Sequence, residues 1–337
     1  MIVRRARRSR WARLAVPALA TAAALAVLVY LLDPRRLVEA VRSADPRWLA
    51  GAALAHALSL LVSAARFRAL VAEPGPSVPL VPRLWGTELI SSGACYFLPP
   101  GAGEIARAGV WKSCAGVPAV RMGVAILVAR ALDFCVLASA VAGLWVFRVL
   151  PEHPSVAGVS TAMAIVAAVL ALLLVGVAWR GKPFYLVLAR RMAGLLSWFR
   201  PRWGPRFERW AAAGVSSGPP HPRPIARDLA LVALTVLYWT GNFALFLCLA
   251  RAVLPDIGWG EVAAIFAFAF ALALVPARPF ADLGTHELGW ALPLAFHGRS
   301  QEEAVAFAAA THLLVAGIML AIVPVGALVT RLGRRPL

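Results

Sequence analysis

Charged residues are scarce in this sequence, at 15% of its 337 positions, and most of them are arginines. Soluble domains average roughly 25% charged residues, so the shortage excludes an ordinary soluble globular protein. There are 16 acidic residues against 34 basic ones, and the only lysines are Lys112 and Lys182. The four cysteines form no C-x-x-C pair, and no H-E-x-x-H segment occurs. The sequence therefore predicts neither a metal site nor a cofactor.

Long apolar runs dominate instead, since 61% of the residues are hydrophobic. A membrane-spanning helix needs about 20 apolar residues. Runs of this length without a charge cover 14–32, 48–65, 156–179 and 229–250. Equally long runs with internal polar residues cover 122–147 and 304–330, and shorter ones cover 84–98 and 262–277. We therefore predict an all-α polytopic membrane protein with about 6–8 transmembrane helices.

The net charge of +18 is concentrated at the ends of these runs. Residues 1–13 contain six arginines and no acid, and residues 180–227 contain ten basic residues against the single acid Glu208. Cytoplasmic loops are enriched in this way, and anionic lipid headgroups attract such segments. No nucleic-acid fold signature accompanies the charge. The expected partner is therefore a membrane lipid, and no nucleic acid.

The charges also predict the domain organisation and a location in the inner membrane of a bacterial-type cell. The positive-inside rule places the N-terminus in the cytoplasm and agrees with Arg66, Arg68 and Arg83 on that side. The expected parts are a basic N-terminus (1–13), a single integral membrane domain (14–330) and a basic tail (331–337). Within the membrane domain we expect a first half (14–179), a cytoplasmic basic loop with an interfacial helix (180–227) and a second half (228–330).

The first break in the apolar pattern is Leu98-Pro-Pro-Gly-Ala-Gly-Glu-Ile-Ala-Arg107. Broken backbone at membrane depth is tolerated only where it lines a cavity or is enclosed by protein, so 84–111 is predicted to be re-entrant from the cytoplasmic face. Its motif residues are Pro99, Gly101 and Gly103. A helix that starts near Gly103 would place Glu104 and Arg107 on one face. Its free amides and Arg107 would suit a phosphate group. A helix cap with a surface ion pair is the alternative.

The second break contains Pro276, Pro279 and Gly284, followed by His286 and Glu287. Charge counting requires the region 261–297 to form a hairpin from the external side. The two breaks would then meet near the midplane, which is the plan of inverted-repeat transporters. His286 could titrate near neutral pH, which would suit proton coupling.

Two further polar positions lie inside predicted spans. Arg130 and Asp133 are three residues apart on one helix face and are expected to pair toward the bundle interior, where a purely structural role is the alternative. Arg130 follows Glu104 by 26 residues, and His312 follows Glu287 by 25. This similar spacing supports an internal repeat.

Taken in order, these motifs resemble the transmembrane region of lysylphosphatidylglycerol synthases and its stand-alone flippase-like relatives. The resemblance rests on Pro99-Pro-Gly-Ala-Gly-Glu104 with Arg107, on Arg130-Ala-Leu-Asp133, and on Pro276, Pro279 and Leu283-Gly-Thr-His-Glu287. It covers about residues 10–330. Relatives tend to have Arg where this chain has His312. The resemblance implies movement of a lipid or lipid-linked group between leaflets.

Three functions follow as hypotheses. In the first, a flippase-like protein binds an anionic headgroup through the site residues Glu104, Arg107, Arg130, Asp133, His286, Glu287 and His312. In the second, the chain is a non-catalytic membrane partner of a lipid-modifying enzyme or glycosyltransferase and docks through 180–227. In the third, it is an intramembrane lipid-phosphate transferase. Because the sequence ends shortly after the last span, we expect no aminoacyl-transfer domain and no enzyme activity.

Overall fold

The computed structural model describes residues 34–71, 81–98, 101–146, 225–273 and 280–333, with scattered residues between 190 and 212. This part of the chain is helical and contains no strand. In chain order the elements are α2 (Pro34–Arg42), α3 (Pro46–Val71), α4 (Val81–Phe97), α5 (Ala102–Ala115), α6 (Ala119–Val146), α9 (Ile225–Val253), α10 (Trp259–Ala273), the 3-10 turn η1 (Phe280–Asp282), α11 (Thr285–Phe296) and α12 (Gln301–Leu332). The predicted spans 14–32 and 156–179, Pro99, Pro276, Pro279 and most of the basic loop lie outside the described residues.

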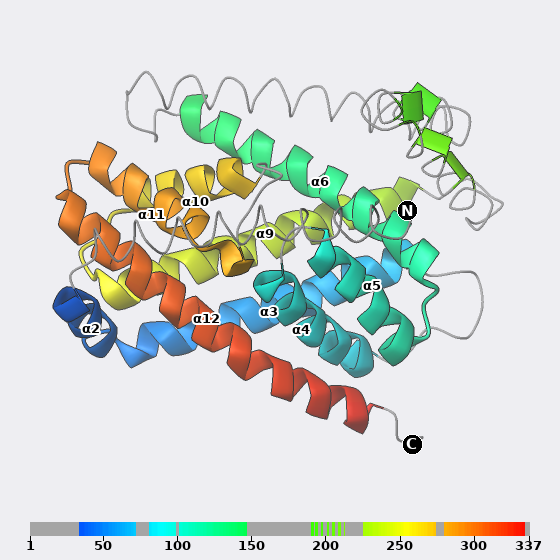
Figure 1. Cartoon of the computed structure of the whole chain (residues 1–337), viewed down its shortest axis with the longest axis horizontal. Coiled ribbons are helices and arrows are strands. Elements are labelled where there is room, and N and C mark those ends of the chain that lie inside the picture. Colours follow the sequence, from blue (N-terminus) through cyan, green and yellow to red (C-terminus); the bar gives the residue numbers. More distant parts are fainter. Residues whose placement is uncertain are drawn as a thin grey trace, which may run out of the picture.

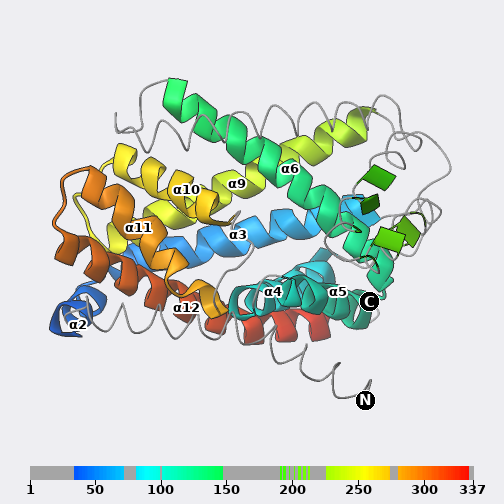
Figure 2. The same cartoon turned by 45° about the horizontal axis from the view of Figure 1, so that its top comes forward.

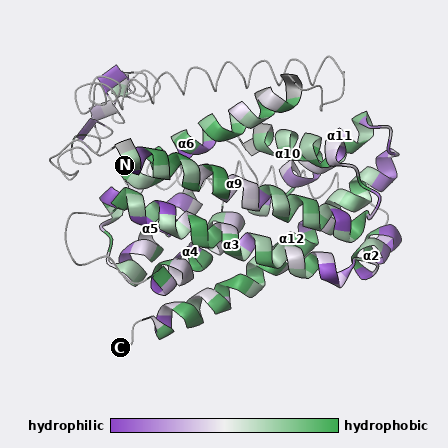
Figure 3. Ribbon diagram, turned by 180° about the vertical axis from the view of Figure 1, so that it is seen from behind, coloured by the Kyte–Doolittle hydropathy of each residue, from purple (hydrophilic) through white to green (hydrophobic). Residues whose placement is uncertain are grey.

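Four of these helices are long and apolar enough to cross a membrane, namely α3, α6, α9 and α12. The predicted runs 48–65, 229–250 and 304–330 lie wholly inside α3, α9 and α12. The run 122–147 lies inside α6 except for its last residue. Large apolar side chains on their outer faces are exposed, including Leu54 at 60% and Leu320 at 62%. Lipid tails are as apolar as leucine and would cover such side chains. Figure 3 shows mainly hydrophobic residues along α9 and α12 and hydrophilic ones on α2. The chain is therefore a multi-pass helical membrane protein.

The long helices run in two directions. α3 and α12 lead from one end of the molecule to the other, and α6 and α9 lead back (Figure 1). α3 packs along α9, and α4 packs along α12. The corresponding helices of the two halves, α3 with α9 and α6 with α12, thus have opposite directions, as an inverted repeat requires.

Two shorter hairpins lie between the long helices. The open end of the hairpin α4–α5 points toward one end of the molecule, and that of α10–α11 points toward the other. Their closed ends approach each other in the middle (Figures 1 and 2). At this point η1 contacts α4, and the ring of Tyr96 lies 6.2 Å from the ring of His312. The two hairpins therefore meet in the middle of the described part of the chain, while their entry from opposite membrane faces stays a prediction.

Glycine is required at both hairpin tips. Gly101 precedes α5 with φ 84° and ψ −44°, and Gly284 precedes α11 with φ 83° and ψ −39°. A side chain in left-handed backbone costs about 1–2 kcal/mol. Gly103 is needed for a different reason, because a Cβ there would lie 2.8 Å from the Cα of Cys95. The predicted motif glycines are thus what allow α4 and α5 to fold back on each other.

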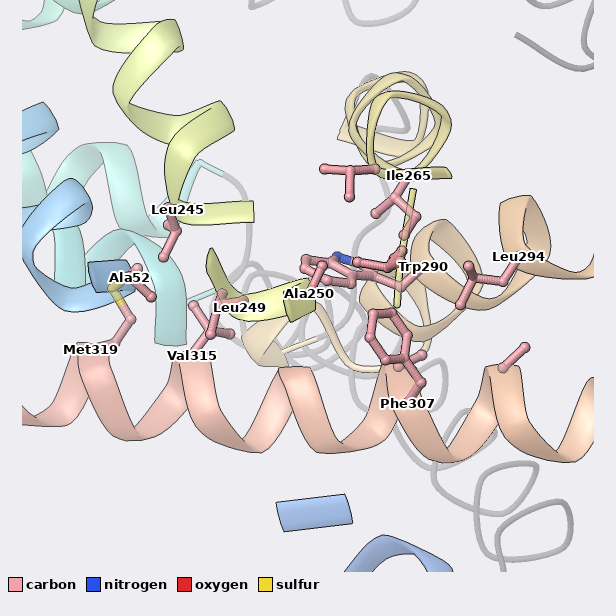
Figure 4. Close-up of a cluster of buried hydrophobic side chains, with 14 of the residues drawn as sticks. Ala52, Leu245, Leu249, Ala250, Ile265, Trp290, Leu294, Phe307, Val315 and Met319 are labelled. Atoms are coloured by element: carbon pink, nitrogen blue, oxygen red, sulfur yellow. The ribbon is translucent and has the colours of Figure 1, made fainter. Parts of the chain in front are cut away.

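The second hairpin is fixed by an apolar core around Trp290 of α11. The indole stacks on Phe246 of α9 with ring centroids 4.9 Å apart, and Phe307 of α12 lies at 5.7 Å. Ile265 of α10 belongs to the same buried cluster (Figure 4). Because helices on three sides contact Trp290, α11 holds its N-terminal residues at a fixed place in the middle of the molecule.

Candidate functional site

Six charged side chains from four helices meet beside the first hairpin. They alternate in sign, and we refer to them as the charge chain: Glu88, Arg107, Glu104, Arg130, Asp133 and Arg66. The helices that supply them are α3, α4, α5 and α6. Three positive and three negative groups make the charge chain neutral. Charges at membrane depth are costly unless they are paired, so the alternation explains how six of them are accommodated.

One end of the charge chain is the carboxylate of Glu88, which is fully buried in α4. Three donors satisfy it. Arg107 Nη1 lies 3.1 Å and Ser63 Oγ lies 2.8 Å from Oε1, and Trp111 Nε1 lies 3.0 Å from Oε2. The guanidinium of Arg107 also lies over the ring of Phe67, 5.2 Å from its centroid. Arg107 is thereby held in place from α3, α4 and α5.

The other end is the pair Arg66–Asp133, whose side chains are 2% and 5% exposed. Asp133 also accepts a hydrogen bond from Trp239 Nε1 of α9 at 2.9 Å. Arg66 lies over the ring of Tyr238, 4.7 Å from its centroid. This end therefore connects α3 and α6 to α9.

The middle of the charge chain is the accessible part. Glu104 is the third residue of α5, and its side chain is 27% exposed, while that of Arg130 is 47% exposed. Arg130 Nε donates to Glu104 Oε1 at 3.1 Å, and its Nη2 contacts the same oxygen. Each group has a second partner: Arg107 Nε lies 3.8 Å from Glu104 Oε2, and Arg130 Nη1 lies 3.8 Å from Asp133 Oδ2. A partly exposed guanidinium is suited to bidentate binding of a phosphate once it is released from its carboxylate partner.

A second cluster lies at the tip of the other hairpin and comprises His286, Glu287 and His312. Glu287 is the third residue of α11; its Oε2 accepts from Gly284 N at 2.6 Å, and its Oε1 lies 2.6 Å from His312 Nδ1. His312 Nε2 lies 2.8 Å from the carbonyl oxygen of Ala281. The rings of His286 and His312 stack with centroids 4.4 Å apart. Among the described residues, no group of three His, Cys, Asp or Glu side chains could hold a metal ion.

The structure thus divides the predicted site residues between two places. Glu104, Arg107, Arg130 and Asp133 belong to the charge chain, and the other three to the histidine cluster. The predicted start of α5 and the shared face of Glu104 and Arg107 are confirmed. The predicted pair Arg130–Asp133 exists only as a long contact, because Arg66 and Trp239 bind Asp133 more closely.

Sequence reasoning missed Arg66 and Glu88 as members of the site. We considered Arg66 only as a positive residue at the cytoplasmic end of a span, whereas the structure buries its side chain against Asp133. Glu88 stood alone in a short apolar run, and its partners Ser63 and Trp111 lie 25 and 23 residues away. The one signal in the sequence that could have identified Glu88 was an acidic residue within an apolar run.

Comparison with known proteins agrees with this architecture. Residues 12–323, nearly the whole chain, match the family described as lysylphosphatidylglycerol synthase TM region. Neither the curated proteins nor the solved structures yield a significant match. The family indicates a membrane domain related to lipid modification or flipping. With its helical membrane architecture and its ordered motifs in two opposed hairpins, the chain belongs to the lysylphosphatidylglycerol synthase TM region family.

Proposed function

We propose that this chain binds and translocates an anionic lipid headgroup, or a lipid-linked anionic group, in the inner membrane of a bacterial-type cell, with its N-terminus in the cytoplasm. The observation that carries the proposal is the accessible pair Glu104–Arg130 in the middle of an otherwise buried charge chain. Buried members fix the geometry, and the accessible members meet the ligand.

When Arg130 leaves Glu104, each of its two carboxylate partners still has another cationic neighbour. Glu104 keeps Arg107 at 3.8 Å, and Asp133 keeps Arg66 and the 2.9 Å hydrogen bond from Trp239. An unpaired buried charge is strongly unfavourable, so these second partners lower the free energy required to release Arg130. A phosphate that replaces Glu104 would gain charge-assisted hydrogen bonds from the guanidinium.

The two hairpins provide the path in this proposal. If α4–α5 and α10–α11 are re-entrant from opposite faces, their tips enclose polar groups near the midplane, where irregular backbone is tolerated because protein surrounds it. The headgroup would pass along these polar groups while its acyl chains stay in the bilayer. The movement requires no bond to be made or broken, so we propose a transporter without enzyme activity.

The test is translocation of headgroup-labelled anionic phospholipid in proteoliposomes. We expect Arg130→Ala to slow translocation roughly tenfold or more, the loss of at least one charge-assisted hydrogen bond. The matched control is Arg36→Ala, because Arg36 also forms an ion pair, with Glu302 at 2.7 Å, but both side chains are at least half exposed on the surface. Arg36→Ala should translocate like the wild type.

Two outcomes would contradict the proposal. Wild-type rates in Arg130→Ala would remove its role in headgroup binding. A wild-type protein that moves no anionic or lipid-linked substrate would contradict translocation itself and favour the partner hypothesis. In that case, deletion of residues 200–222 should abolish the complex with a lipid-modifying enzyme while membrane insertion persists.

A further inference from the structure

The hydrogen bonds of His312 determine how many protons the histidine cluster holds. The Ala281 carbonyl can only accept, so His312 Nε2 must donate the bond at 2.8 Å. On the other side of the ring, Nδ1 faces Glu287 Oε1 at 2.6 Å. That bond needs one proton, on either the imidazole or the carboxyl group. The observed geometry therefore contains one proton more than an ionised carboxylate beside a neutral imidazole.

Loss of this proton cannot preserve both bonds. A neutral imidazole carries one N–H. If the hydrogen stays on Nε2, then Nδ1 and the carboxylate of Glu287 face each other as two acceptors, and no hydrogen bond joins them. If it moves to Nδ1, the bond to Glu287 survives and Nε2 faces the Ala281 carbonyl as an acceptor. The ionised carboxylate is the stronger acceptor, so the second arrangement is favoured and the bond to Ala281 breaks.

We propose that Glu287 and His312 bind one shared proton, and that its release detaches the hairpin tip at Ala281 and so couples headgroup movement to protons. The proton site stands on the geometry of this cluster, whereas the coupling rests on the proposed function. The proton-loaded pair is neutral, and the deprotonated pair carries one negative charge at membrane depth. Release therefore requires the tip to open toward water.

Loss of the hydrogen bond from His312 to Ala281 should allow the hairpin tip to change its backbone conformation. Ala281 and Asp282 are consecutive non-glycine residues with φ 52° and 57°, a conformation that persists only when surrounding contacts impose it. The bond from His312 to the Ala281 carbonyl is one such contact. Because η1 also contacts α4, opening this tip changes the place where the two hairpins meet.

Three titratable groups of the described residues lie beside the pair. Tyr96 of α4 approaches His312 edge to face, His286 of α11 stacks on it, and Asp282 belongs to η1. In the described part of the chain, Glu287 forms no ion pair with an arginine or lysine. The equivalent residue of the first hairpin, Glu104, pairs with Arg130, a permanent cation that holds its proton at any accessible pH. One half of the repeat thus exchanges protons, and the other does not.

Infrared difference spectroscopy of the full chain in lipid nanodiscs, titrated with pH, tests the proton site directly. We expect the wild type to show paired carboxyl and imidazole bands that titrate together. Glu287→Gln and His312→Gln should each lose both bands. Glu104→Gln is the matched control, because it alters the third residue of the other hairpin helix and should keep both bands, whatever its effect on transport.

Several results would overturn the proposal. Bands that survive in Glu287→Gln or His312→Gln would show that the proton is not shared. Loss of the bands in Tyr96→Phe or His286→Gln with the pair intact would assign the titration to a neighbour. Each variant must first elute as a single species, and a misfolded glutamine variant would be replaced by Glu287→Asn or His312→Asn.

Transport measured against pH separates this inference from the proposed function. We expect wild-type translocation to change at least tenfold across the pH range in which the bands titrate, and His312→Arg to be independent of pH because its cation is permanent. Titrating bands without translocation would refute the transporter and leave the proton site intact. Translocation that is independent of pH while the bands titrate would refute the coupling.

Discussion

Glu104 and Glu287 occupy the same position in two helices, each the third residue after a glycine with φ near 84°. Each pairs with a residue of the following long helix, 26 or 25 residues onward. The two halves therefore share the same backbone turn before the helix. They differ in the side chain that pairs with the carboxylate, which is arginine in one half and histidine in the other.

Gly101→Ala should destabilise the protein by about 1–2 kcal/mol, because alanine in left-handed backbone is strained. A Cβ at Gly101 meets no atom within 4 Å, so the loss would come from the backbone alone. The control is Gly109→Ala in the same helix, which also meets nothing within 4 Å. There alanine should be neutral or stabilising by up to about 1 kcal/mol. Thermal unfolding in detergent compares the two, and equal effects would contradict the argument.

Asp133→Asn should destabilise the protein by about 3–5 kcal/mol, because it leaves the buried guanidinium of Arg66 without its counter-charge. The double variant Arg66→Met with Asp133→Leu should recover most of this loss, since it removes both charges. Glu302→Gln, in an ion pair with side chains 50% and 71% exposed, should change stability by less than about 1 kcal/mol. A double variant no more stable than Asp133→Asn would show that the pair is not the cause.

Gly326→Ala should force α4 and α12 apart, because its Cβ would lie 2.7 Å from Leu89 Cβ and 2.8 Å from the carbonyl oxygen of Gly86. We expect a loss of about 1–3 kcal/mol from overpacking. Gly317→Ala in the same helix meets nothing within 4 Å and is the matched control. Similar unfolding temperatures for both variants would mean that the two helices are not in fixed contact.

Arg299 should stabilise the turn before α12 at neutral and alkaline pH. Its guanidinium contacts Glu261 and Asp256 at 3.0 Å and Glu303 at 3.2 Å, and the hydrogen bond to Glu261, foremost, raises the pKa of Arg299 above its ordinary value. A raised pKa means that the folded chain holds the proton of Arg299 more tightly. Loss of that proton therefore removes the contribution only as pH rises from the unfolded pKa through the folded one.

Arg299→Gln should therefore lower stability by about 1 kcal/mol at neutral pH, where three carboxylates lose their shared cation. Acidification should reduce this difference, because protonated carboxyl groups no longer repel one another. Unfolding temperatures of the variant and the wild type at several pH values test both parts. A difference that does not shrink toward low pH would contradict the electrostatic explanation.

The sequence predicted the helical fold well because membrane spans are long and uniform in composition. The runs 48–65 and 304–330 lie inside α3 and α12. The hairpin tips were also predictable, since proline and glycine close together end a helix even where the surrounding residues are apolar.

Partners within the site were harder to predict from sequence. Local spacing suggested Asp133 for Arg130, but helix packing supplied Arg66 from a helix 67 residues earlier. Similarly, nothing in the order of residues indicates that Ser63, Trp111 and Arg107 converge on Glu88. Such contacts depend on how helices cross, which periodicity within one helix does not reveal.

In the charge chain, three carboxylates balance three guanidinium groups, so the loss of any single member leaves an excess charge. Removal of any one leaves a neighbour with an unmatched charge inside the membrane, while removal of two adjacent members restores neutrality. Substitutions in the charge chain should therefore be inherited in pairs. Among family members, loss of an acid at one of these six positions should coincide with loss or exchange of an adjacent arginine, and that covariation can be sought in sequences alone.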